Sequence, residues 1–267
     1  MLYGMILAFG ASIFWTFSPV FFAAAGRKIG PYKVNLLRLV MAALLFCVIG
    51  FVYNLFSGGA FLLPVPWRAS LYLVLSGLFG LVIGDMFYLQ ALITLGPRRT
   101  TQFLTLAPIV PVVVAWVVLG EKLSWNILLG IGLIIGGIAY IVFHEQSLIQ
   151  EKTAEPGKFT TKGFILTIVG VLFHSSGAVM ARWAFIEAPD CDPIAATAVR
   201  VVSSGIIMLL FAIFRNNVLG AIKDLGTPGV PSRLTGGVLA GPVIGMVFYI
   251  AAFKYAYAGV VTTLSGL

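Results

Sequence analysis

Long apolar runs separated by short polar connections cover most of this 267-residue chain. A helix needs about 20 apolar residues to cross the hydrocarbon core of a bilayer, and eight runs reach that length. A further apolar run begins after them and extends to Leu267. We therefore expect a polytopic helical membrane protein with eight full spans and the start of a ninth. The expected spans are 2–24, 34–56, 70–95, 100–119, 125–143, 163–185, 194–214 and 234–257.

The composition supports a membrane protein. Hydrophobic residues make up 60% of the chain and charged residues 10%, whereas a soluble domain carries about 25% charged residues. The first apolar run has neither a basic segment before it nor a small-residue cleavage motif, and a similar run returns at 163–185. It is therefore predicted to be a span rather than a signal peptide. The two cysteines, Cys47 and Cys191, form no metal or redox motif.

The net charge of +8 comes from basic residues that are spread over the loops between spans. This distribution excludes nucleic acid as a partner and indicates that the charges orient the helices, because basic loops stay on the cytoplasmic side. We expect the loops after spans one, three, five and seven to face the cytoplasm and the N-terminus to lie outside. Their eleven basic residues are Arg27, Lys28, Lys33, Arg98, Arg99, Lys152, Lys158, Lys162, Arg215, Lys223 and Arg233.

The pattern of spans repeats once along the chain. Residues 82–84 (Val-Ile-Gly) return as residues 243–245 at an offset of 161, and Arg38 returns as Arg200 at an offset of 162. One pair lies in the third predicted helix of each half and the other in the second, so the repeat covers whole helices rather than a short motif.

The repeat predicts the domain organisation. We assign residues 1–143 to a first repeat and residues 163–267 to a second, incomplete repeat. Residues 144–162 are polar, contain Pro-Gly and are predicted to link them. If five spans are the unit, the two halves must lie in the membrane upside down relative to each other, as in many secondary transporters.

Three segments resemble a known family. They are GDMFYLQAL around Asp85, the polar hinge at 96–100, and LAPIVPVVVAWVVLGEKLSWNILLGIGLIIGGIAYIV at 106–142. Together they resemble the EamA-type ten-helix family of the drug/metabolite transporter superfamily. The resemblance extends over essentially the whole chain and implies two tandem five-helix halves. The chain departs from the family at its C-terminus and is expected to be truncated within helix nine.

The resemblance and the repeat imply an integral secondary transporter, an exporter or exchanger of a small metabolite or drug-like solute, that works by alternating access in the cytoplasmic (plasma) membrane. The expected partners are a small-molecule substrate and the lipid bilayer, with no nucleic acid, no cofactor and no metal; a homodimer stays open. The alternative is a membrane-embedded lipid-handling protein or a lipid-modifying enzyme, and a channel is a further one. An intramembrane aspartyl protease is excluded, because Asp85 follows Val-Ile-Gly rather than Gly-x-Gly and no second acid lies within a span.

Five residues are candidates for binding substrate: Trp15, Asp85, Tyr88, His174 and Tyr249. An ionisable group inside a span costs roughly 2.5–3.5 kcal/mol on insertion scales, so Asp85 and His174 are expected to be functional and to couple protons. Trp15 falls on His174 in the repeat, at an offset of 159, and Tyr88 falls on Tyr249. Aromatic side chains in apolar spans more often serve packing, so these three carry less weight. No catalytic residues are expected.

Other roles for the charged residues stay open. Asp85 could cap a broken helix or pair with an arginine, and Met246 occupies its position in the second half, so any role of Asp85 is asymmetric. Arg38 lies about one turn inside its span, where a long side chain can extend to the lipid headgroups. The symmetry of Arg38 and Arg200 is as consistent with packing as with substrate binding.

Overall fold

The computed structural model describes residues 1–57, 65–104 and 160–266 together with a few isolated positions between 109 and 140. Apart from these isolated positions, the predicted span 125–143, all but the first residues of the span 100–119, and the linker up to residue 159 lie outside the described residues. Pro108, one of the prolines in the predicted fourth span, lies outside them as well.

Every regular element in the described part of the chain is helical. The first half contains α1 (Leu2–Ile29), α2 (Pro31–Ser57), α3 (Trp67–Gly77), η1 (Leu78–Gly84), α4 (Asp85–Leu95) and α5 (Pro97–Leu104). The second contains α8 (Thr161–Glu187), α9 (Pro193–Phe214), α10 (Val218–Asp224), α11 (Val230–Val238), η2 (Leu239–Gly245), α12 (Met246–Tyr255) and α13 (Ala258–Ser265). Six continuous helical segments in these residues are long and apolar enough to cross a membrane.

These six segments correspond to the predicted spans one, two, three, six, seven and eight. Their ends differ from the prediction by a few residues. α1 continues through Arg27 and Lys28 and ends at Ile29. Gly30 follows it with a φ of 83°, a value that residues other than glycine rarely adopt. α8 begins at Thr161, inside the predicted linker, because the side chain of Thr160 caps it by accepting a hydrogen bond from the amide of Gly163 at 3.1 Å.

Two spans contain a π-helical segment instead of a continuous α-helix. The third span is α3–η1–α4 and the eighth is α11–η2–α12. The two π segments lie 161 residues apart, which is the offset that the sequence predicts for a repeat. Pro242 in η2 has no backbone N–H to continue an α-helical ladder. π segments are rare and often lie at functional sites, and here each one ends directly before the residue that opens the next helix, Asp85 or Met246.

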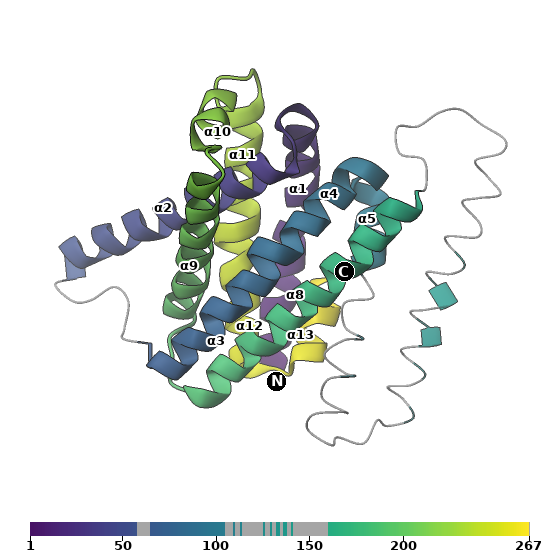
Figure 1. Cartoon of the computed structure of the whole chain (residues 1–267). Helices are drawn as coiled ribbons and strands as arrows, with labels where there is room; N and C mark the ends of the chain where they lie inside the picture. Colours follow the sequence, from purple (N-terminus) through teal and green to yellow (C-terminus); the bar gives the residue numbers. More distant parts are fainter. Residues whose placement is uncertain are drawn as a thin grey trace.

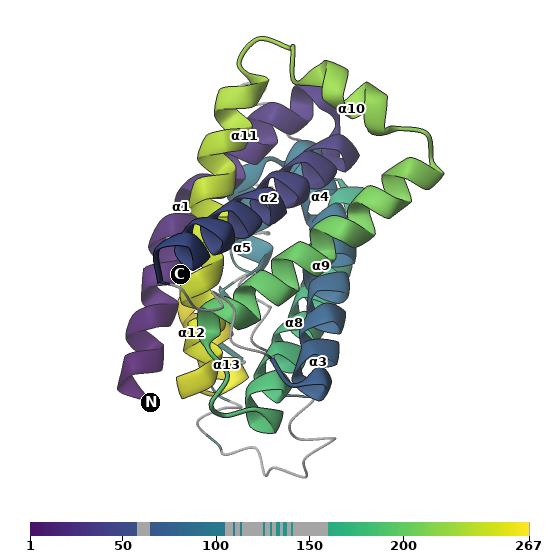
Figure 2. The ribbon, with the colours of Figure 1, turned by 90° about the vertical axis from the view of Figure 1, so that its left-hand side faces the viewer.

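The helices pack so that each half contacts the other extensively. α2 packs against α9, α1 packs against α11, η2 and α12, and α8 packs against α3, η1 and α4 (Figures 1 and 2). α1 begins at the lower end of the molecule in Figure 1, whereas α8 begins at the upper end and runs in the opposite direction. The first helix of each half therefore lies against the π-containing span of the other half.

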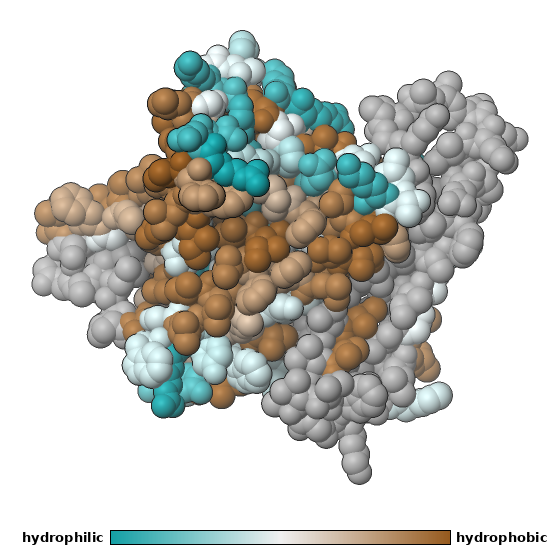
Figure 3. Space-filling view, in the orientation of Figure 1, coloured by the Kyte–Doolittle hydropathy of each residue, from teal (hydrophilic) through white to brown (hydrophobic). Residues whose placement is uncertain are grey.

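The surface carries an apolar band between two polar ends (Figure 3). Large apolar side chains such as Phe51 and Phe214 are 67% and 86% exposed, far more than water tolerates over so wide an area. At the end that holds α10, Lys33 and Asp224 form an ion pair at 2.6 Å. This distribution fits a polytopic integral membrane protein whose apolar band contacts lipid.

Candidate functional site

Asp85 is the centre of a buried ion network. It is the first residue of α4 and only 4% exposed. One carboxylate oxygen, Oδ2, accepts a hydrogen bond from Nη2 of Arg38 on α2, and the other, Oδ1, accepts one from Nε2 of His174 on α8 at 2.7 Å. A buried carboxylate without a partner would cost several kcal/mol. Of the roles that the sequence left open, the structure thus has Asp85 paired with an arginine.

Arg38 is buried, so extension to the lipid headgroups, one of the roles that the sequence left open for it, is not what the structure shows. Its Nε donates to Oδ1 of Asn35 at 2.9 Å. The amide nitrogen of Asn35 in turn donates to the carbonyls of Leu81 and Val82 in η1, at 3.3 and 3.1 Å. α2 thereby holds the π segment that positions Asp85.

The aromatic candidates form two pairs. The ring of Tyr88 lies edge-on to His174, with centroids 6.0 Å apart. The ring of Trp15 lies 4.7 Å from that of Tyr249, and Trp15 Nε1 donates to the carbonyl of Gly241 at 3.4 Å. A Cβ atom on Gly245 would lie 2.4 Å from Trp15 Nε1, so only glycine allows this approach.

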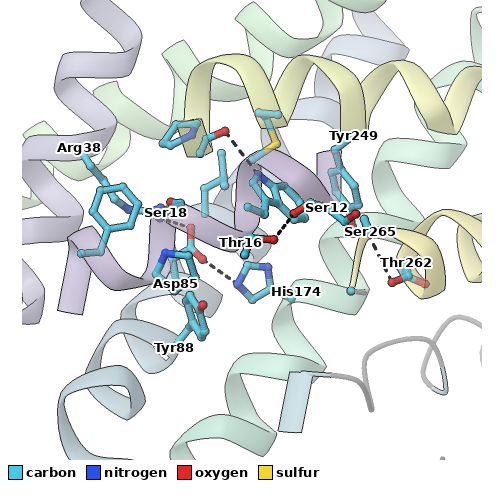
Figure 4. Close-up of a pocket in the computed structure, with 18 of the residues that line it drawn as sticks. Ser12, Thr16, Ser18, Arg38, Asp85, Tyr88, His174, Tyr249, Thr262 and Ser265 are labelled. Carbon is cyan, nitrogen blue, oxygen red and sulfur yellow. Dashed lines mark hydrogen bonds and ion pairs between the residues drawn. The ribbon is translucent and has the colours of Figure 1, made fainter. Parts of the chain in front are cut away.

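All five predicted site residues line one cavity of about 610 Å³. Figure 4 shows Asp85 between Arg38 and His174, with Tyr88 beside them and Tyr249 across the cavity near Thr262 and Ser265. The residues of the wall come from α1, α2, η1, α4, α5, α8, α9, η2, α12 and α13, hence from both halves of the chain. Pockets for small molecules have volumes of about 300–1,000 Å³, so the cavity can enclose a metabolite-sized solute.

Several hydroxyl groups in the wall were missed by the sequence reasoning. Those of Ser12, Thr16, Ser18, Thr262 and Ser265 donate their protons to backbone carbonyls, so the oxygens can still accept hydrogen bonds; Ser12, for example, donates to Phe9 at 2.8 Å and Thr16 to Ser12 at 2.9 Å. The available signal was the four-residue spacing of Ser12 and Thr16, which places both on one face of a helix. The hydroxyl residues of the wall are Ser12, Thr16, Ser18, Ser175, Thr262 and Ser265.

Chemically, the described wall of the site offers charged and hydrogen-bonding groups. No group of three or more His, Cys, Asp or Glu side chains gathers in the described ranges. Six membrane-length helices around a cavity with buried ionisable groups are the architecture of a polytopic transport protein, because such groups line substrate and ion pathways.

The comparison with protein families agrees with this class. The model of the EamA-like transporter family matches residues 2–143 and 161–267. The chain belongs to this family, within the drug/metabolite transporter superfamily, and is therefore a membrane transporter of the drug/metabolite type. Members of the family are in general not enzymes.

The fold also has a counterpart among solved structures. A chain titled "Crystal structure of protein" aligns with a TM-score of 0.58 and 18% sequence identity, and the alignment covers 98% of this chain and 84% of that one. At this identity the likeness concerns the fold alone. The comparison with curated protein sequences gives no significant match.

Proposed function

We propose that the protein is a secondary transporter, an exporter or exchanger in the plasma membrane, that carries a small metabolite or drug-like solute by alternating access. The observation that carries this proposal is the cavity of about 610 Å³ in which the network of Arg38, Asp85 and His174 lies. Charged groups in a membrane-spanning bundle are costly and concentrate on transport pathways. The substrate is bound between the Trp15–Tyr249 pair and the group formed by Asp85, Tyr88 and His174.

The two halves form an inverted repeat in this proposal, with the substrate held between them. Two hydrogen bonds support it. Ser76 Oγ donates to the carbonyl of Gly177 at 2.6 Å, and Ser18 Oγ donates to the carbonyl of Gly237 at 3.4 Å. Ser76 corresponds to Gly237 and Ser18 to Gly177 at the repeat offsets of 161 and 159. The two bonds thus join the same two positions of the repeat. The position that donates in one bond accepts in the other, and in both bonds the donor belongs to the first half. The opposite directions of α1 and α8 support the inversion as well.

Asp85 and His174 couple protons to transport. Since Nε2 of His174 donates to Asp85, the proton that His174 takes up or releases is the one on Nδ1. Arg38 balances the charge of Asp85, so protonation of His174 adds one positive charge to the cavity. Tyr88, a second titratable group, packs edge-on against the imidazole. Histidine is the side chain that changes charge near neutral pH, which suits exchange of a proton for a solute.

Alternating access requires helices that can bend next to the cavity. Pro19 in α1 and Pro242 in η2 line it, and Asp85 directly follows η1. A proline removes a hydrogen bond of the helical ladder, and a π segment interrupts that ladder. We assign the bending to these positions.

The test is solute flux in proteoliposomes loaded with a defined mixture of amino acids, organic acids and amines, with and without an imposed pH gradient. Solutes released are identified by mass spectrometry, and flux is normalised to the amount of folded protein. We expect wild type to release a subset of solutes at a rate that depends on the gradient, and Asp85→Asn and His174→Gln to lose that dependence. Asp224→Asn is the matched control, because Asp224 pairs with Lys33 away from the cavity.

Two results would contradict the proposal. If wild type releases no solute faster than protein-free vesicles, the transport function fails. If both cavity variants keep full flux and the pH response of wild type, neither residue couples protons.

A further inference from the structure

The cavity wall contains two arginines in different electrostatic situations. Arg38 is paired with Asp85. Arg200, on α9, is only 2% exposed, and its Nε and Nη1 are buried without a hydrogen-bond partner among the described residues. No carboxylate in the described part of the chain lies within ion-pair distance of it. Burial of a charge without a partner is far more costly than burial of a pair, so an anion bound next to Arg200 would offset that cost.

The repeat explains why Nε and Nη1 of Arg200 have no partner in the part of the chain that the structure describes. Arg200 corresponds to Arg38 at an offset of 162. The two acceptors that serve Arg38 are replaced in the second half: Met246 stands where the first half has Asp85, and Thr197 stands where it has Asn35. Thr197 uses its hydroxyl on the carbonyl of Pro193 at 2.7 Å. The second half thus contains the arginine but neither of the two side chains that accept hydrogen bonds from its counterpart in the first half.

The surroundings of Arg200 hold the guanidinium at the cavity. Arg200, Met246 and Tyr249 all line it. The Cζ atom of Arg200 lies 6.0 Å from the ring centroid of Tyr249. On the other side, a Cβ atom on Gly80 would lie 2.7 Å from Nη2, so the glycine leaves the room that the guanidinium occupies.

We propose that Arg200 binds a carboxylate of the transported solute and that the substrates are small organic acids. The inference rests on the proposed transport function and names its substrate class. A guanidinium is planar and always charged, and its parallel N–H groups match a carboxylate in a bidentate pair. Since Arg38 and Asp85 cancel, Arg200 adds one positive charge to the described wall of the cavity, and the carboxylate of the solute neutralises it. The Trp15–Tyr249 pair next to it packs against the solute's apolar body.

The test measures binding rather than flux, so that it can fail independently of transport. Thermal unfolding of the full chain in detergent is followed with phenylacetate, hexanoate and succinate, each compared with its primary amide at equal ionic strength. A ligand that binds only the folded protein raises the apparent Tm. We expect at least one carboxylate to raise it and its amide to have no effect. If no carboxylate stabilises the protein more than its amide, the inference is wrong, even where flux is observed.

Variants of the site separate binding from packing. Arg200→Gln is expected to bind the carboxylate about ten- to a hundred-fold more weakly, the size of a lost charged hydrogen bond. Its Tm without ligand should equal or exceed that of wild type, because an unpartnered buried charge has been removed. A lower Tm together with unchanged carboxylate binding would assign Arg200 to packing and overturn the inference.

A second substitution provides Arg200 with a carboxylate partner from the protein itself. Met246→Asp places a carboxylate at the repeat position of Asp85, and we expect it to pair with Arg200 and to abolish stabilisation by added carboxylates. Arg215→Gln, at an exposed arginine beyond the end of α9, is the matched control and should keep the wild-type preference. Full carboxylate binding in both Arg200→Gln and Met246→Asp would contradict the assignment.

Discussion

Replacement of Asp85 by asparagine removes one charge from the buried network with almost no change in shape. Arg38 is 5% exposed, and Asp85 is the carboxylate that it pairs with. An asparagine oxygen can still accept a hydrogen bond, but it cannot balance the guanidinium charge. Removal of one partner of a buried ion pair destabilises a protein by roughly 3–5 kcal/mol. For a chain of this size this corresponds to a fall in Tm of roughly 6–20 °C.

The assay is the apparent Tm of purified Asp85→Asn in detergent at a fixed scan rate, because membrane proteins of this kind unfold irreversibly and the rate matters. The double variant Asp85→Leu with Arg38→Met should recover most of the loss, since apolar residues of similar volume replace a buried ion pair at little cost. Asp224→Asn breaks an ion pair whose side chains are 26–28% exposed, so its expected cost is only about 0–1 kcal/mol. A Tm of Asp85→Asn equal to that of wild type would refute the reasoning, as would a double variant less stable than Asp85→Asn.

Two further predictions follow from close contacts and from topology. Gly245→Ala should cost about 1–3 kcal/mol, because the new Cβ would lie 2.4 Å from Trp15 Nε1, whereas Gly236→Ala on the same span meets its neighbours at 3.4 Å or more and should be close to neutral in the same Tm measurement. In intact cells an impermeant maleimide should label Cys191, in the loop predicted to lie outside, and should not label the variant Lys223→Cys in which Cys191 is also replaced by serine; the reverse pattern would invert the assigned orientation. Burial, and next the charge of Asp192, raise the pKa of the Cys191 thiol, so its labelling should be slow at neutral pH and speed up as the pH rises.

The sequence alone was sufficient to predict the membrane class, the six described spans and the presence of one acid, Asp85, within a span. An apolar run of about 20 residues is most stable as a membrane-spanning helix, because a helix pairs its own backbone N–H and C=O groups where lipid offers no partners. Asp85 and His174 stood out for a local reason as well: each is an ionisable group within an apolar run. The repeat positions of Trp15 and Tyr249 could also be read directly from the residue offsets.

The tertiary structure decided which side chains meet. Asp85 pairs with Arg38 on one span and His174 on another, and no spacing in the chain specifies that encounter. The physical reason is that these spans are apolar on nearly every side, so their periodicity does not separate a lipid-facing from a cavity-facing side. For the same reason the hydroxyl groups of α1, such as Ser12, were missed. Whether a buried arginine has a partner depends on the packing of three or more helices, and only the fold distinguishes Arg38, which has one, from Arg200, whose Nε and Nη1 have none among the described residues.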